Sequence, residues 1–293
     1  MRSARHLASR LAAFARSDRA TKRAAVETLL LDRVIRRPIV YTDADGLRYV
    51  LYPGENAGAY LANRGNYEVA EVRFCTRTLA PGQTVVDVGA NIGLYTLLAA
   101  KSVGPDGNVH AFEPEPENAR RIRVNLALNG VGNVELFEAA VYSTPGVVEL
   151  NVFAPEFNAW HSIGRPEVVD PAHPSTPVEP TATIEVPAVT LDDHCRTHAI
   201  DRIDLLKVDV EGAELDVLKG ARELLAQRAA RTILFEASLP QIAALGHAAD
   251  DCFGLLAEHG YTTSSLTADG ELGPAVGAPT SEYGNYVAVA PAP

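Results

Sequence analysis

One stretch decides the fold: residues 85–97 read VVDVGANIGLYTL. The β-branched run from Thr84 to Val88 predicts a buried strand, and the Ala/Leu-rich run from Leu94 to Lys101 predicts a helix. Gly89 and Gly93 fall in the turn between them, where missing side chains let a ligand approach the backbone. The pattern therefore predicts an α/β protein with a nucleotide-binding strand–turn–helix unit.

Asp87 indicates the charge of the ligand. A turn built for a pyrophosphate uses backbone N–H groups and a helix N-terminus, and both favour anions. A carboxylate at the tip of the strand would repel a phosphate and attract an ammonium group, which disfavours a nicotinamide-dependent oxidoreductase. We therefore expect S-adenosyl-L-methionine, held by Asp87 and by the turn residues Gly89, Ala90, Asn91 and Gly93.

Length and composition favour one α/β domain with additions. The chain has 293 residues, of which 47% are hydrophobic, so it can bury a large core. We find no apolar run as long as a membrane span and no secretory signal pattern. The three cysteines, Cys75, Cys195 and Cys252, show no paired spacing, which predicts buried thiols and a reducing, cytoplasmic location.

The net charge of −11 is distributed unevenly. Residues 1–37 hold 10 of the 26 Lys and Arg residues, and we expect them to form a basic helical N-terminal arm. The arm would pack on its own domain or on a second subunit of a homo-oligomer, with peripheral membrane contact as the alternative. Residues 38–293 should form a single domain, and their acidity disfavours nucleic acid as a partner.

Residues 38–80 precede the glycine turn and are expected to cap its opening. Two short alternating runs flank residues 43–46, which predicts a hairpin, and a helix should follow and end at Pro81. Tyr67 and Glu68 are the polar residues of this cap best placed to touch a ligand, although an ordinary helix start explains them equally well.

Two further strands supply positions for a nucleoside. The run from Asn108 to Phe112 predicts a strand that ends in Glu113 and Pro114, and an acid at this place typically accepts hydrogen bonds from ribose hydroxyls. Residues 134–137 predict a third strand, with residues 147–153 as a hairpin partner. Glu138 and Ala139 would then lie beside the adenine.

Residues 155–187 are rich in proline and predict a functional loop insertion. The segment carries the only tryptophan of the chain, Trp160, next to His161. An aromatic ring beside an imidazole suits the recognition of a sugar or polyol, so Trp160 is a candidate substrate-binding residue. A tryptophan that anchors the loop to the core is an equally good explanation.

Ionisable residues gather at the end of another predicted strand, residues 203–210. Alternation places Lys207, Asp209 and Glu211 on one side, where they are costly in a sheet core and natural at a ligand crevice. A structural ion pair of Lys207 with a carboxylate is the alternative. The next strand, residues 232–236, also ends in an acid, Glu236, a candidate for substrate binding.

With these residues in view, the sequence resembles the FkbM family of S-adenosylmethionine-dependent methyltransferases. The resemblance is carried by residues 85–97, 111–116, 186–193 and 206–214, and it extends over about residues 40–290. It implies a Rossmann-like class I methyltransferase fold, with a seven-stranded, mostly parallel sheet, an antiparallel last strand and helices on both faces.

The resemblance also implies methyl transfer, often to a hydroxyl of a sugar, polysaccharide or natural-product scaffold, so the partner would be a small-molecule or glycan acceptor. We expect Asp209 or Glu211 to orient the acceptor or take its proton, with His161 as an alternative base. A divalent metal ion at these carboxylates is a less favoured alternative, and no metal ligand is assigned. A nitrogen or carboxyl acceptor and a non-catalytic binding protein that kept the cofactor fold stay open as alternatives.

Overall fold

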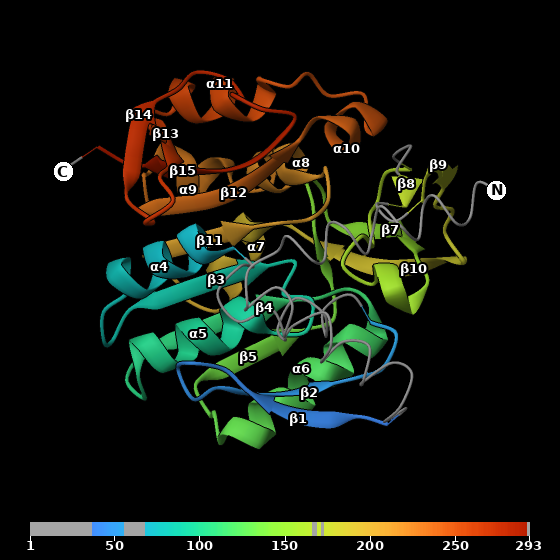
Figure 1. The fold of residues 1–293 in the computed structure, drawn as a ribbon. Coiled ribbons are helices and arrows are strands. Elements are labelled where there is room, and N and C mark those ends of the chain that lie inside the picture. The colour runs from blue at the N-terminus through green and yellow to red at the C-terminus, as the bar shows by residue number, and fades with distance from the viewer. Residues whose placement is uncertain (1–36, 56–67, 166–168, 171–172, 292–293) are drawn as a thin grey trace.

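The computed structural model describes residues 37–55, 68–165, 169–170 and 173–291 (Figure 1). Of the predicted basic arm only Arg37 is described, and Tyr67 also lies outside the described residues. None of the helices in the described part combines the length and apolar character that crossing a membrane requires. All three cysteines are buried and free, as predicted.

The centre of the protein is an eight-stranded sheet. In spatial order its strands are β14 (Leu272–Ala275), β13 (Thr262–Leu266), β15 (Tyr283–Val289), β12 (Thr232–Ser238), β11 (Leu205–Val208), β3 (Thr84–Val88), β4 (Asn108–Phe112) and β5 (Val134–Phe137).

The pairing of these strands confirms the predicted fold class. The five strands from β12 to β5 are parallel to one another, and the last strand, β15, is antiparallel to β12 and β13. The short edge strand β14, antiparallel to β13, is the eighth strand and was not predicted.

Helices cover both faces of the sheet because β3 and its neighbours alternate their side chains between two apolar cores. Val86 and Val88 pack in one core with residues of five helices: α7 (Leu191–Thr197), α8 (Glu214–Lys219), α9 (Arg222–Ala226), α10 (Leu239–Ala244) and α11 (Asp251–Glu258). Val85 packs in the other core with α4 (Val69–Thr78) and α5 (Leu94–Val103). The helix α6 (Pro116–Asn129) packs on β4 through Ile122 and Ala111.

A second, three-stranded sheet stands beside the main one, on the right of Figure 1. It consists of β6 (Ala140–Val141), β10 (Ala182–Val189) and β7 (Gly146–Val152). The predicted strand near residues 147–153 is confirmed, but its partner is β10 rather than the strand at 134–137. The proline-rich segment between β7 and β10 holds a short 3₁₀ turn, η2 (Pro155–Phe157), and two short strands, β8 (Val169–Asp170) and β9 (His173–Pro177).

The predicted N-terminal hairpin is confirmed as β1 (Ile39–Thr42) and β2 (Arg48–Leu51). Its turn is held by Asp43, whose carboxylate accepts from two backbone N–H groups. The hairpin is fixed to α6 because Asn125 and Asn129 accept hydrogen bonds from the backbone of β2.

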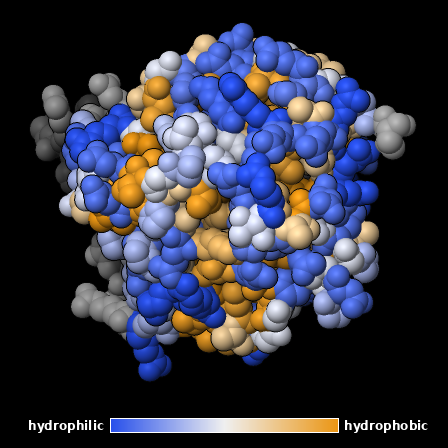
Figure 2. Space-filling view, turned by 180° about the vertical axis from the view of Figure 1, so that it is seen from behind, coloured by the Kyte–Doolittle hydropathy of each residue, from blue (hydrophilic) through white to orange (hydrophobic). Residues whose placement is uncertain are grey.

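From behind, the surface shows apolar side chains interspersed with hydrophilic ones (Figure 2).

Candidate active site

A cavity of about 540 Å³ opens at the carboxyl ends of the parallel strands, where α/β folds of this kind bind ligands. Its walls come from the turn after β3, the segments after β4 and β5, the proline-rich segment and the ends of β11 and β12. The following residues predicted from the sequence line it: Gly89, Ala90, Asn91, Glu113, Pro114, Ala139, Trp160, His161, Asp209, Glu211 and Glu236. Glu68 of the predicted cap lines it too.

The glycine turn is shaped by its contact with the neighbouring strand. Gly89 has a φ of +81°, and a Cβ atom built on it would lie 1.8 Å from the carbonyl oxygen of Asp209. Glycine is therefore required for β3 and β11 to approach so closely. Gly93 does not line the cavity; it begins α5 with a φ of +91°, next to Ile122.

Glu113 ends β4 inside the cavity with only 5% of its surface exposed. One carboxylate oxygen accepts from the backbone N–H of Asn91 at 2.8 Å, and the other from that of Glu115 at 2.9 Å. Burial raises the pKa of Glu113 to about 8, although both hydrogen bonds oppose the shift. Each carboxylate oxygen keeps a second lone pair, so Glu113 can also accept from a pair of hydroxyls.

Asp87 is not among the described lining residues of the cavity, although its neighbours Val88 and Lys207 line it. The carboxylate is 1% exposed and accepts a hydrogen bond from Thr96 of α5 at 2.6 Å. Its other oxygen, Oδ1, has no hydrogen-bond partner in the described part of the chain and lies 3.9 Å from Lys207 Nζ. The two residues are register partners on β3 and β11. The predicted contact between Asp87 and a ligand stays a prediction.

Glu138 is also absent from the described lining of the cavity. Its half-exposed carboxylate pairs with Arg123 of α6. Its neighbour Ala139 lines the cavity, together with Ala140 and Val141. The segment after β5 therefore offers an apolar wall, and a role for Glu138 beside an adenine stays a prediction.

The predicted cluster after β11 is present, and it includes the predicted ion pair. Lys207 Nζ lies 3.0 Å from Asp209 Oδ2 and 4.5 Å from the centre of the Tyr95 ring. Burial alone would lower the pKa of Lys207, but the carboxylates of Asp209 and Asp87 outweigh burial and raise it. From the sequence, a structural ion pair and a ligand crevice were alternative explanations for these residues. In the structure the ion pair of Lys207 and Asp209 itself lines the cavity.

Three carboxyl groups converge at this end of the cavity. Asp209, Glu211 and Glu236 offer oxygen atoms that all lie within 4.8 Å of one another. Burial and the neighbouring acids raise the pKa values of Glu211 and Glu236 well above their ordinary range. Such groups can exchange protons with a bound hydroxyl, and their oxygen ligands are also of the kind a divalent cation takes.

Two residues that the sequence did not single out complete the cluster. Gln241 of α10 donates a hydrogen bond from its amide to Glu211, and Tyr283 of β15 hydrogen-bonds Glu236. Glu211 has a φ of +55°, an uncommon backbone conformation for this residue type, and Gly212 packs against the backbone of Gln241. Gln241 and Tyr283 carry no sequence signal, because their contacts with Glu211 and Glu236 arise only when α10 and β15 pack beside the strand ends.

The proline-rich segment closes the other side of the cavity. Trp160 is half-buried and stacks on Phe157, with ring centres 4.9 Å apart, while it also lines the cavity. His161 Nδ1 accepts from the backbone N–H of Phe153 at 3.1 Å, and burial lowers the pKa of His161 to about 4. The neutral ring therefore carries its proton on Nε2 and can donate a hydrogen bond from it. His161 could act as a base only if the hydrogen bond between Phe153 and Nδ1 were first broken.

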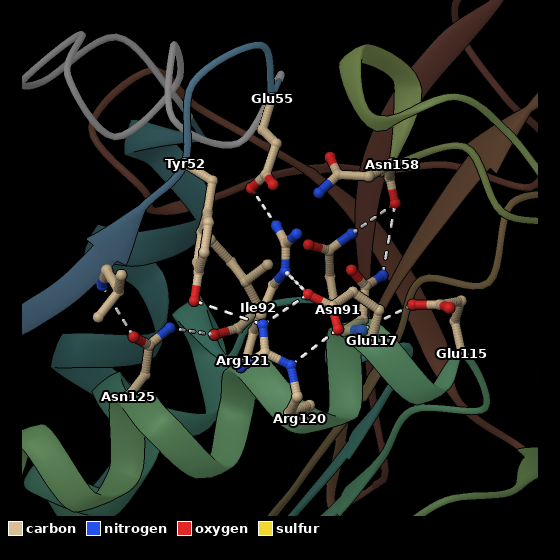
Figure 3. A network of polar contacts seen from close by, with 12 residues as sticks. Tyr52, Glu55, Asn91, Ile92, Glu115, Glu117, Arg120, Arg121, Asn125 and Asn158 are labelled. Carbon is tan, nitrogen blue, oxygen red and sulfur yellow. Dashed lines mark hydrogen bonds and ion pairs between the residues drawn. The ribbon is translucent and has the colours of Figure 1, made fainter. Parts of the chain in front are cut away.

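Figure 3 shows how this segment meets α6 and the glycine turn. The carbonyl of Asn158 accepts from the amides of Asn91 and Asn118, at 3.2 and 3.5 Å. In the same view Arg121 pairs with Glu55, just after β2.

The lining is compatible with S-adenosylmethionine. A buried carboxyl group with free acceptor capacity suits a ribose diol, and the apolar wall suits a flat base. A cationic sulfonium and ammonium would be attracted by Asp209 and its neighbouring acids and would favour their ionised forms. Unlike a phosphate site, the cavity has one Lys or Arg side chain among its described lining residues, Lys207, and that cation is already paired.

Comparison with known proteins identifies relatives. Residues 87–263, more than half of the chain, match the family described as Methyltransferase FkbM domain. The chain is 31% identical over 63% of its length to the 31-O-demethyl-FK506 methyltransferase FkbM of Streptomyces tacrolimicus and covers 74% of that protein. It is 34% identical over 47% of its length to the methyltransferase sdnD of Sordaria araneosa, and 30% identical over 50% to the 2-O-methyltransferase NoeI of Sinorhizobium fredii. The chain spans 60% of the length of each of these two proteins.

Proposed function

Because the match over residues 87–263 shows that the chain belongs to the FkbM methyltransferase family, we propose that it transfers a methyl group from S-adenosylmethionine to a hydroxyl of a sugar or a hydroxylated natural product. The observation that carries the proposal is the shared cavity, which is lined by Glu113, the glycine turn and three converging carboxyl groups. The proposed cofactor site and the proposed site for proton removal would thus share one space.

The charge of the cavity favours a hydroxyl acceptor over a carboxyl acceptor. Its described lining contains one cation, Lys207, and six acids: Glu68, Glu113, Asp209, Glu211, Glu236 and Glu282. The raised pKa values of Glu113, Glu211 and Glu236 show that added negative charge is unfavourable here, so an anionic acceptor would be disfavoured. A neutral hydroxyl adds no charge and can hydrogen-bond with either form of these carboxyl groups. The names of the Streptomyces and Sinorhizobium relatives refer to O-methyl chemistry and support the same choice.

Each side chain has a defined task in this proposal. Glu113 would hold the ribose hydroxyls, and the apolar wall from Ala139 to Val141 would flank the base. When bound, S-adenosylmethionine supplies an electrophilic methyl group on a sulfonium. Asp209, held in place by Lys207, would accept the proton of the acceptor hydroxyl, and Glu211, held by Gln241, would orient that hydroxyl.

Trp160 and His161 would form the acceptor side of the site. The exposed part of the indole offers a face for a sugar ring, and the Nε2–H of His161 can donate to a ring hydroxyl. The stack of Trp160 on Phe157 limits the movement of the indole, so the platform needs little ordering when an acceptor binds.

Transfer of a labelled methyl group to a panel of neutral sugars and polyhydroxylated compounds tests the proposal. Asp209→Asn should lower turnover by about 10²–10⁴-fold, because it removes the proton acceptor. Its affinity for S-adenosylhomocysteine should stay within about threefold of the wild type. The matched control is Asp193→Asn, an exposed carboxylate on α7 that pairs with Arg196, and it should leave turnover unchanged. Methyl transfer to carboxyl groups or amines alone would refute the acceptor class, and cofactor binding without any transfer would favour the non-catalytic alternative.

A further inference from the structure

The side-chain amide of Asn158 is buried at the cavity without a partner. The residue is 5% exposed and lines the cavity, and neither Oδ1 nor Nδ2 has a hydrogen-bond partner within the part of the chain that the structure describes. A buried amide that lacks all its hydrogen bonds is unfavourable, so natural proteins rarely keep one without a reason. A ligand in the cavity would supply the missing partners.

The backbone fixes the place of this amide. Asn158 follows the 3₁₀ turn η2, and its carbonyl is held by the side-chain amides of Asn91 and Asn118 (Figure 3). Asn91 in turn donates its own backbone N–H to Glu113. The backbone that carries the free amide is therefore linked through Asn91 to Glu113, the carboxylate that would hold the ribose.

The neighbouring wall lacks polar side chains. It is formed by Pro114, Ala139, Ala140, Val141, Leu150 and Ile163. Glu138, the acid that the sequence suggested for this place, pairs with Arg123 instead. A flat base could be buried against such a wall, but the side chains of the wall could not distinguish one base from another.

We propose that the side-chain amide of Asn158 recognises the edge of the adenine ring of S-adenosylmethionine. A carboxamide presents one donor and one acceptor side by side, which matches the amino group and the ring nitrogen N7 of adenine. When a carbonyl replaces the amino group, this edge offers two acceptors, and a carboxamide cannot pair with both. Asn158 is thus a specificity-determining residue for the nucleobase. The inference rests on the proposed function, since it needs the adenosyl cofactor to occupy the cavity.

Calorimetric titration with two ligands tests the inference: S-adenosylhomocysteine and S-inosylhomocysteine, in which a carbonyl replaces the amino group. The wild type should bind the adenosyl ligand about tenfold more tightly than the inosyl ligand, within the range for a bidentate amide–adenine pair. Asn158→Ala should bind the adenosyl ligand about tenfold more weakly and lose the preference between the two. The carbonyl contacts to Asn91 and Asn118 persist in this variant, because they involve the backbone.

The matched control is Asn133→Ala. The amide of Asn133 donates to the carbonyls of Ala100 and Gly104, at 3.1 and 2.8 Å, and it does not line the cavity. This variant should lower the melting temperature of the free protein and leave ligand affinity unchanged. Asn158→Ala should do the reverse. Because an unpaired buried amide is removed, the melting temperature of the free protein should stay the same or rise, whereas the adenosyl ligand should bind more weakly.

The outcomes separate the inference from the proposed function. If the wild type binds S-adenosylhomocysteine and Asn158→Ala keeps both the affinity and the preference, Asn158 does not read the base. If the variant weakens both ligands equally, the amide contacts another part of the cofactor and the inference is wrong. A wild type that binds neither ligand overturns the proposed function and the inference with it.

Discussion

Replacement of Lys207 by methionine would expose how much the site depends on one buried cation. Lys207 is 6% exposed, 3.0 Å from Asp209 and 3.9 Å from Asp87. With an effective dielectric constant of about 20, these attractions amount to about 5 and 4 kcal/mol before the cost of burying the charges. Since desolvation cancels part of this gain, we expect Lys207→Met to lower the free energy of unfolding by about 3–5 kcal/mol at pH 7.5.

The loss should depend on pH with a defined sign. Burial raises the pKa of Asp87 even beside Lys207, and removal of the cation would raise it further. A carboxyl whose folded pKa exceeds its unfolded pKa binds more protons in the folded state, so stability falls as the pH rises between the two values. The deficit of Lys207→Met should therefore shrink as the pH falls, by up to about 1.4 kcal/mol per pH unit for each proton taken up.

Urea unfolding at pH 7.5 and pH 5.5 measures both effects. Lys207→Met/Asp209→Asn should recover part of the loss, because one of the two uncompensated carboxylates is gone. Lys101→Met, at an exposed lysine of α5, is the control and should change stability by less than about 0.5 kcal/mol. An equal deficit at both pH values, or a deficit below 1 kcal/mol, would refute the electrostatic reasoning.

Three further predictions concern other parts of the structure. Gly89→Ala should destabilise the fold by more than about 3 kcal/mol in urea unfolding, because its Cβ would overlap the Asp209 carbonyl; a change below 1 kcal/mol would contradict that packing. The affinity for S-adenosylhomocysteine should increase as the pH rises through about 8, where Glu113 ionises to accept both hydroxyls, whereas Glu113→Gln should show no such increase; parallel profiles would exclude Glu113 as the cause. Burial and the neighbouring histidines lower the pKa of His194 to about 3, so its contribution to stability is lost as the pH falls below about 6.5. His194→Phe should reduce this acid loss, and a variant that melts like the wild type across pH 4–7 would argue against it.

The fold could be predicted from the sequence where local patterns decide structure. The run around Asp87, the acid after residues 108–112 and the alternation near Lys207 marked three strands of the parallel sheet. The hairpin around residues 43–46 followed from its turn residues. The edge strand β14 carries no comparable signal, because it contains Gly273 and Pro274, and both residue types are depleted in strands.

The orientation of individual side chains was harder to predict. A strand pattern places Asp87 near the carboxyl end of β3, but it does not specify the side chains around it. The register of β11 beside β3 brings Lys207 next to Asp87, and Thr96 of α5 donates a hydrogen bond to it. Glu138 depends in the same way on Arg123 of the neighbouring helix. Asn158 and Gln241 reach the cavity through connections whose path the sequence does not specify.

The measurement that tests the account most directly is the thermal stability of the protein with S-adenosylhomocysteine and with NAD. At 100 times its dissociation constant, a ligand stabilises the folded state by about 2.7 kcal/mol, which is readily seen as a rise in melting temperature. The account predicts that S-adenosylhomocysteine raises the melting temperature of the wild type, that Glu113→Ala responds much less, and that NAD has no effect. Stabilisation by NAD, or no response to S-adenosylhomocysteine, would contradict it.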